Sequence, residues 1–479
     1  MPPEPKRFLF KNIALAAASG EVLEDRDILV ENDRIVSISP SGGVAAPLAV
    51  QPARTARPPA PKTASTVGAA TTSGGSSPTA RLGNSTEVYD GWGKLALPGF
   101  YNLHSHVPMT LLRGYGEGLP LKTWLFERIF PFEALLTEED CYWGSLLGIA
   151  EMLASGTVSF SDMYLLTPGI AKAVTESGIK ANLSHGYSTA PKSKGFADSR
   201  AYEGTRFLME AARTDTSGRL VPDAAVHAEY TFGDERFGRE IAEFCRREGL
   251  RVQIHLSETK DEHETCKAKR GCTPTAFFDS CGLFEVPAIA AHGVWLEDRD
   301  LDIFAERGIS LAHCPVSNLK LASGMAPIQK IIDRGIRVCL GTDGAASNNN
   351  LNLLKEANLA SLLQKGLTGD PLALGPAQLL ELASRNGALA QGRTDCGTLE
   401  EGMKADIIVF NLDSPRMRPD YDPLVSVFFA ADSSDIVLTM VDGQILYKSG
   451  KFTTIDITRV LAEAERIQGE KLHRLEGKQ

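Results

Sequence analysis

From about residue 97 to residue 390, the sequence alternates short apolar strand-like segments with amphipathic helical segments. The strand-like segments are 158–163, 180–186, 223–230, 251–258, 288–294, 309–315 and 337–343. Helical patterns lie between them, as at 139–155, 235–248, 299–307 and 328–334. Together with a strand that ends near His104, these segments make eight strand–helix units. This repeat predicts an α/β fold of the (β/α)₈-barrel type.

The segments on either side of this repeat contain short strands and tight turns. Strand-like runs flank the Asn32-Asp33 turn before residue 40 and the Asp442-Gly443 turn after residue 396. We expect these runs to pair with residues 87–96 in a small β-sandwich beside the barrel. The predicted organisation is sandwich strands at 1–40, 87–96 and 396–452, a barrel at 97–395, and a C-terminal helix at 453–479.

The stretch at 41–86 has a composition unlike that of the rest of the chain. It consists mainly of Ala, Pro, Ser, Thr and Gly, and it contains no acidic residue. Such a segment buries too little apolar surface to offset the entropy lost on ordering. We therefore predict a disordered low-complexity insertion at 41–86 that loops out between two sandwich strands.

The overall composition narrows the class of protein. The chain has 479 residues, a formal net charge of −10 and a sequence pI of about 5.5, which argue against nucleic-acid or anionic-membrane partners. Its eight cysteines include no Cys-x-x-Cys pair, so a zinc ribbon is not expected. No signal-like leader and no apolar run of about 18 residues is found. We predict a cytoplasmic homo-oligomer with reduced thiols that acts on a small molecule.

Histidines and acidic residues gather at the carboxyl ends of the predicted barrel strands, where this fold builds active sites. His104 and His106 are two residues apart, so in a strand their imidazoles point to one face. His255 ends a later strand, and Asp343 ends the last strand, which lies beside the first in a closed barrel. Three imidazole nitrogens and one carboxylate suit a divalent metal. The alternatives are ordinary strand histidines and, for Asp343, a helix N-cap.

Two further groups suit hydrolytic chemistry beside such a metal. Glu258 lies three residues after His255, where the chain leaves the barrel, and burial there would let it act as a general acid. A surface position at a helix start is the alternative. His292 can hydrogen-bond a hydroxide or a transition-state oxygen, and His227 is placed to contact a substrate.

Six motifs together resemble the amidohydrolase superfamily. They are PGFYNLHSH at 98–106, VPMTLLRG at 107–114, IHLSET at 254–259, AAHGV at 290–294, PVSNLKL at 315–321 and LGTDGAASNNN at 340–350. Within this superfamily they resemble the 5′-methylthioadenosine/S-adenosylhomocysteine deaminases. The resemblance covers essentially the whole chain apart from about 41–86.

The resemblance implies a role for each candidate at the metal. The implied metal ligands are His104, His106, His255 and Asp343. Glu258 would donate a proton and contact the substrate, His292 would polarise the attacking hydroxide, and Asp343 would take the proton from water and also contact the substrate. Two-metal relatives have a bridging lysine on the fourth strand, and 221–231 contains none. One divalent ion per subunit is therefore expected, with zinc favoured over ferrous iron.

The resemblance also implies the substrate contacts. Trp124 would pack against a purine, and Glu133 and His227 would hold the ribose hydroxyls; core packing and a solvated helix end are the alternatives for Trp124 and Glu133. His185 stands where some family members have an arginine that reaches the homocysteine carboxylate. Arg200 could supply part of that contact. Adenosine, 5′-methylthioadenosine and 5′-deoxyadenosine are therefore at least as well favoured as S-adenosylhomocysteine.

The sequence thus predicts a metal-dependent hydrolytic deaminase, a hydrolase of C–N bonds in cyclic amidines. It would convert an adenosine-like nucleoside to its inosine analogue and ammonia. A triazine chlorohydrolase and a deaminase of guanine or cytosine-like bases are alternatives on the same scaffold, but Glu258 suits protonation of a ring nitrogen. A non-catalytic barrel is the remaining alternative, and the full set of ligand candidates argues against it.

Overall fold

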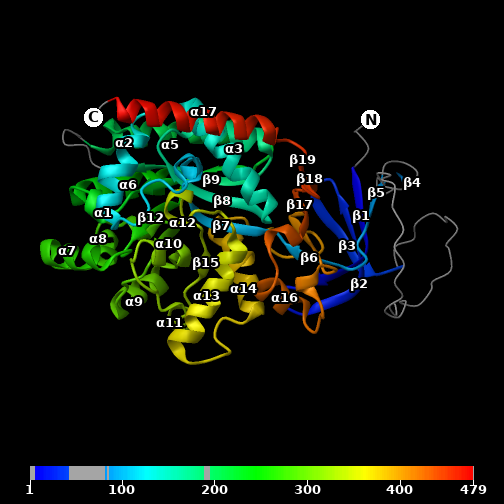
Figure 1. The fold of residues 1–479 in the computed structure, drawn as a ribbon. Coiled ribbons are helices and arrows are strands. Elements are labelled where there is room, and N and C mark those ends of the chain that lie inside the picture. The colour runs from blue at the N-terminus through cyan, green and yellow to red at the C-terminus, as the bar shows by residue number, and fades with distance from the viewer. Residues whose placement is uncertain (1–5, 43–80, 83–85, 188–194, 478–479) are drawn as a thin grey trace.

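A parallel barrel forms the larger part of the computed structural model, which describes residues 6–42, 81–82, 86–187 and 195–477 (Figure 1). The barrel strands are β7 (Phe100–Ser105), β8 (Thr157–Tyr164), β9 (Lys180–Tyr187), β11 (Ala224–Val226), β12 (Val252–Leu256), β13 (Ala288–His292), β14 (Ser310–His313) and β15 (Val338–Leu340). They lie in this order, and β10 (Leu220–Pro222) pairs with β9. The barrel closes because the N–H groups of Thr342 and Asp343 donate to the carbonyl oxygen of His104 over 3.2 and 2.9 Å. The predicted (β/α)₈ barrel is confirmed.

Helices connect successive strands and surround the barrel (Figure 1). They are α3 (Glu138–Ala154), α4 (Thr167–Ser177), α5 (Arg200–Thr214), α6 (Glu235–Glu248), α7 (Lys260–Arg270), α8 (Pro274–Ser280), α9 (Asp298–Arg307), α10 (Pro315–Lys320) and α11 (Ile328–Asp333), followed after β15 by α12 (Ala345–Asn348), α13 (Leu353–Thr368), α14 (Pro376–Ala383) and α15 (Arg385–Ala390). The strand expected at 223–230 is shorter, because the chain turns where the N–H of Ala228 donates to Thr231 Oγ1 over 3.3 Å.

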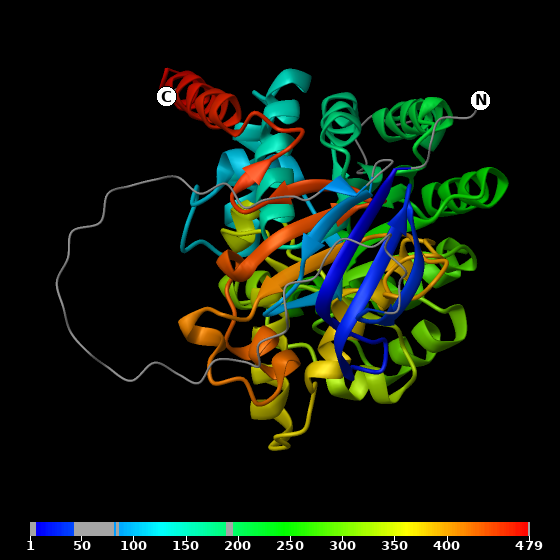
Figure 2. The same ribbon diagram turned by 90° about the vertical axis from the view of Figure 1, so that its right-hand side faces the viewer.

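The N- and C-terminal strands share a second sheet, as predicted. Its strands are β1 (Arg7–Ala16), β2 (Val22–Glu31), β3 (Arg34–Pro40), β4 (Arg81–Leu82), β5 (Thr86–Asp90), β6 (Lys94–Pro98), β16 (Ile407–Asn411), β17 (Ile436–Val441), β18 (Gln444–Lys448) and β19 (Lys451–Phe452). Strand β6 lies between β1 and β16 and pairs with both, so it connects the N-terminal strands to the C-terminal strands in one sheet (Figure 2). One apolar cluster contains Phe10 and Ile28 from the first strands with Val409 and Met440 from the last.

The remaining segments lie at the edges of these two units. Of the predicted insertion at 41–86, Arg81 and Leu82 pair with β5, whereas 43–80 and 83–85 are outside the described residues. Helix α17 (Ile457–Glu476) packs on α3, where the buried Lys471 ammonium lies 2.8 Å from an Asp140 carboxylate oxygen. Within the described ranges, no helix combines the length and the apolar character needed to span a bilayer.

A buried ion cluster joins the start of β9 to the second sheet. The Lys180 ammonium lies 2.5 Å from Asp406 Oδ2 and 2.8 Å from Asp442 Oδ1. The Tyr101 hydroxyl also donates to Asp406 over 2.5 Å. Burial disfavours the charge on Lys180, but the two carboxylates outweigh it and raise the pKa of the ammonium. The barrel and the sheet are thus held together by buried charges that depend on one another.

Replacement of Lys180 by Met is expected to lower the free energy of unfolding by about 3–5 kcal/mol, because it leaves buried carboxylates without their cation. Urea denaturation followed by circular dichroism measures this loss. The matched control is Lys122→Met, which removes an exposed lysine paired with Asp261 and should cost less than about 1 kcal/mol. Equal effects of the two substitutions would contradict a structural role for the cluster.

Candidate metal centre and active-site pocket

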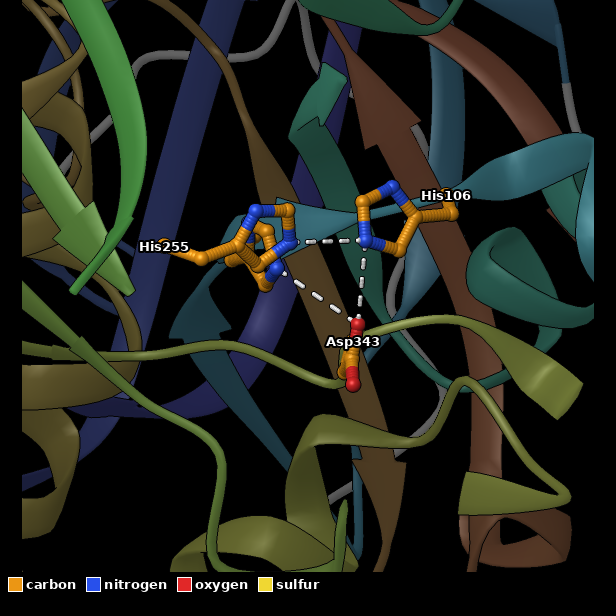
Figure 3. Close-up of side chains that lie close together, drawn as sticks. His106, His255 and Asp343 are labelled. Carbon is orange, nitrogen blue, oxygen red and sulfur yellow. Dashed lines mark hydrogen bonds and ion pairs between the residues drawn. The ribbon is translucent and has the colours of Figure 1, made fainter. Parts of the chain in front are cut away.

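Four side chains meet at the carboxyl ends of the barrel strands, and Figure 3 labels three of them, His106, His255 and Asp343. His104 lies in β7 and His106 directly follows this strand; His255 lies in β12, and Asp343 follows β15. One ligand atom of each lies within 4.8 Å of the other three. His106 is partly buried and the other three are buried. The structure therefore brings together all four predicted metal ligands, from segments up to 239 residues apart in sequence (343 − 104).

The backbone fixes the protons on two of these imidazoles. Nδ1 of His106 lies 2.5 Å from the carbonyl oxygen of Met163, and Nδ1 of His255 lies 2.7 Å from that of His227. A carbonyl oxygen only accepts hydrogen bonds, so each Nδ1 carries a hydrogen and each neutral ring has its lone pair on Nε2.

The Nε2 atoms of His106 and His255 face each other at 3.1 Å. Two lone pairs at this distance repel unless a cation lies between them. Nε2 of His104 is also buried, and it has no hydrogen-bond partner among the described residues. The three Nε2 atoms therefore fit a metal ion, since metal-bound imidazoles typically donate their other N–H to an acceptor such as a carbonyl oxygen.

Asp343 presents one oxygen to the histidines and keeps the other in a hydrogen-bond network. Its Oδ1 lies 3.2 Å from Nε2 of His106 and 3.5 Å from Nε2 of His104. Its Oδ2 accepts hydrogen bonds from the hydroxyls of Ser317 and Ser347 over 2.6 and 2.7 Å. The two serines orient the carboxylate, so that Oδ1 completes a donor set of three nitrogens and one oxygen, which suits zinc.

Glu258 and His292 face each other beside this donor set. Oε2 of Glu258 lies 3.8 Å from Nε2 of His292, and the Ser323 hydroxyl donates to Oε1 over 3.3 Å. Nδ1 of His292 lies 2.9 Å from Oδ1 of Asn318. Glu258 is only 4% exposed, and burial raises the pKa of its carboxyl group against an opposing effect of His292. Glu258 can therefore retain a proton at a higher pH than an exposed glutamate.

A pocket of about 860 Å³ includes these groups in its wall. Trp124 and Glu133 line it from a continuous helical segment formed by α1 (Leu121–Trp124), the π-helical turn η2 (Leu125–Ile129) and α2 (Phe130–Glu133). Burial raises the pKa of Glu133. His227 lines the pocket too, and burial lowers its pKa to about 4, so its imidazole is neutral at pH 7.

A sequence model of the amidohydrolase family matches residues 95–446, which include the whole barrel. The chain belongs to the amidohydrolase family. Among curated relatives, this amidohydrolase is 41% identical over 377 residues to 5-methylthioadenosine/S-adenosylhomocysteine deaminase of Pelotomaculum thermopropionicum, covering 79% of this chain and 86% of the relative. It is 42% identical over 389 residues to 5′-deoxyadenosine deaminase of Methanosarcina mazei, covering 81% and 89%.

Solved structures agree with this assignment. An adenosine deaminase from Xanthomonas campestris with bound zinc has a TM-score of 0.85 and 28% identity, covering 98% of this chain and all of that one. Atrazine chlorohydrolase TrzN from Arthrobacter aurescens has a TM-score of 0.81 and 22% identity, covering 96% and 100%, and shows the same fold. The predicted superfamily, the resemblance to the deaminases and the expected hydrolase class are confirmed by these relatives.

The structure does not bring His185 into the pocket of this amidohydrolase. Successive side chains of a strand point to opposite faces, and the His185 ring packs against α5, so closely that a Cβ on Gly204 would lie 2.4 Å from it. Gly186 and Arg200 line the pocket instead. The expectation that His185 contacts the substrate is therefore corrected: position 185 faces the helix layer.

Sequence reasoning missed the residues that orient the active-site groups. Ser317 and Ser347 bind Asp343, and Asn318 lies against His292. All three lie within the motifs at 315–321 and 340–350. Those motifs were a signal of their importance, but their roles depend on contacts between loops that no spacing rule predicts.

Proposed function

We propose that this amidohydrolase is a metal-dependent hydrolytic deaminase of adenosine-like nucleosides. The observation that carries the proposal is a buried glutamate, Glu258, in one large pocket beside a donor set of three imidazole nitrogens and one carboxylate. A buried acid next to a hydrolytic metal site suits a reaction in which a ring nitrogen must be protonated. The names of the relatives that act on 5′-methylthioadenosine, S-adenosylhomocysteine or 5′-deoxyadenosine support the same reaction.

The side chains divide the chemistry between them. A divalent ion held by His104, His106, His255 and Asp343 would lower the pKa of a water molecule and make hydroxide available near neutral pH. Asp343 accepts the proton that the water releases. His292 orients the attacking oxygen through Nε2, which is unprotonated when Nδ1 donates to Asn318. Glu258 donates its proton to N1 of the adenine ring as the oxygen bonds to C6. The C6–N bond then breaks, the amino group takes the proton held by Asp343 and leaves as ammonia, and the C6 hydroxyl returns a proton to Glu258.

The pocket wall supports an aromatic nucleoside as substrate. Trp124 offers a flat apolar surface for the purine, and Glu133 and the neutral His227 offer hydrogen bonds for the ribose hydroxyls. Arg200 is exposed and contributes the pocket's positive charge, which suits a substrate with a carboxylate tail. The 860 Å³ volume is ample for a nucleoside with a 5′ substituent.

The metal, the oligomeric state and the cellular location are further parts of this proposal. We infer that one zinc ion per subunit occupies the donor set, and that the enzyme is a cytoplasmic homo-oligomer. A triazine chlorohydrolase is the second candidate on the same fold. Glu258 favours deamination over that candidate, because it is placed to protonate a ring nitrogen.

Adenosine, 5′-deoxyadenosine and 5′-methylthioadenosine are expected to be deaminated at least as fast as S-adenosylhomocysteine, since among the described lining residues the exposed Arg200 is the only arginine or lysine that could meet a carboxylate tail. Loss of adenine absorbance measures each kcat/KM. If Arg200 contacts that tail, Arg200→Met should lower kcat/KM for S-adenosylhomocysteine about tenfold more than for 5′-methylthioadenosine. A strong preference of the unmodified enzyme for S-adenosylhomocysteine would contradict this expectation, and inactivity on all four would contradict the proposed function.

A further inference from the structure

The turn that carries Glu258 has a strained backbone. Ser257, between β12 and α7, has a φ of +48°, a left-handed conformation that a residue with a side chain rarely adopts. Such conformations persist only where surrounding groups hold them, and they concentrate at functional sites. The groups that hold Ser257 therefore decide where the carboxyl group of Glu258 lies.

Glu262, in the first turn of α7, binds the backbone of this strained turn. Its Oε1 accepts the N–H of Ser257 over 3.2 Å, and its Oε2 accepts the N–H of Glu258 over 2.7 Å. Glu262 is 3% exposed. Two consecutive N–H groups directed at one carboxylate form a two-point attachment, which fixes the orientation of the peptide plane as well as its position.

This arrangement is more than a helix cap. The N-cap of α7 is Thr259, whose hydroxyl accepts the N–H of Glu262 over 3.1 Å. In an ordinary capping box, a glutamate three residues after the N-cap binds the N-cap N–H in return. The Glu262 carboxylate also accepts the N–H groups of Ser257 and Glu258, which lie two residues and one residue before the N-cap, on the turn that carries the acid.

The neighbours of Glu262 support the same turn from other sides. The Ser257 hydroxyl lies 3.1 Å from Nδ1 of His263, and the N–H of Trp295 donates to the Ser257 carbonyl over 3.0 Å. Held in this way, Glu258 reaches the Ser323 hydroxyl and faces His292. The position of the Glu258 side chain therefore depends on the backbone that Glu262 holds.

We propose that Glu262 is a positioning residue that fixes the backbone at Ser257 and Glu258, so that the carboxyl group of Glu258 is held at the substrate ring. This proposal rests on the proposed function, in which Glu258 is the proton donor. Glu262 is not one of the described residues that line the pocket, so we expect it to make no contact with the substrate. It acts only through Glu258.

Glu262→Gln and Glu262→Ala test the proposal in the metal-loaded enzyme. The glutamine keeps one acceptor oxygen and should lower kcat about tenfold, whereas the alanine removes both acceptors and should lower it about 100-fold, since small misplacements of a reacting group have effects of this size. KM should change less than about threefold in each, because no substrate contact is lost. The matched control is Glu264→Gln on the same helix, an exposed glutamate whose kcat and KM should be unchanged.

Amide hydrogen exchange gives a readout that does not depend on the substrate. Exchange at Ser257 and Glu258 should be about tenfold faster in Glu262→Gln than in the unmodified enzyme or in Glu264→Gln. Unchanged exchange at these two amides would overturn the proposal whatever the activity. Faster exchange with an unchanged kcat would also overturn it, because the attachment would then be structural only. Inactivity of the unmodified enzyme on adenine nucleosides would instead count against the proposed function, while exchange still tests the attachment.

Discussion

Glu258→Gln is expected to keep the metal and to lower kcat at least about 10³-fold. Glutamine has nearly the same shape and can still bind the Ser323 hydroxyl, but it cannot transfer a proton to a ring nitrogen. None of the four metal donors changes, so the metal content should match that of the unmodified enzyme. Elemental analysis and a deamination assay on the same preparation measure both quantities. A variant with metal and near-normal turnover would contradict the assignment of Glu258 as the proton donor.

The same role predicts a direction for the pH dependence. Burial raises the pKa of Glu258 above the ordinary glutamate value of 4.5, and a proton donor acts only in its protonated form. Activity that depends on this proton is present below the raised pKa and is lost as the pH rises through it. In Glu258→Gln, the residual kcat should not show this loss with rising pH. If kcat of the variant still falls at the same pH, the group that titrates there is not Glu258.

Removal of the metal is expected to abolish turnover, and one equivalent of zinc per subunit should restore it. Without the ion, no group in the pocket makes hydroxide available at neutral pH, and the loss should be at least about 10³-fold. His255→Ala should act similarly and should not recover, because it deletes one of the three imidazole nitrogens. Dialysis against a chelator, zinc titration and elemental analysis measure these effects.

The control for the histidine substitution is His473→Ala, which changes an exposed histidine of α17 and should alter neither metal content nor kcat. Full activity of metal-free protein would contradict the metal-dependent mechanism. Restoration that needs two equivalents of zinc would contradict the prediction of one ion per subunit.

The sequence predicted the barrel and the metal donors because simple periodicities govern both. Two histidines two apart on a strand share a face, and parallel strands bring their carboxyl ends together, so His104, His106, His255 and Asp343 could be joined without coordinates. His185 shows the limit of such reasoning. It also lies near the end of a strand, but the alternation of side chains turns it toward α5, and only the observed register reveals this.

Other parts of the site lay beyond sequence pattern. The segment with Trp124 and Glu133 contains a π-helical turn at 125–129, so its pattern does not follow one helical period, and both residues were expected only from the family resemblance. No sequence pattern singled out Glu262. Its role depends on the turn at Ser257, whose left-handed conformation is a tertiary property. The proposed domain boundaries stay a prediction.

Carbonyl oxygens fix the tautomers of two candidate metal ligands, His106 and His255, and this separates two tasks at position 227. The carbonyl group of His227 holds Nδ1 of His255, while its imidazole lines the pocket. A substitution at 227 changes a side chain that lines the pocket, but every amino acid supplies the same carbonyl group. The pocket wall can therefore be altered there without changing the hydrogen bond that orients the imidazole of His255.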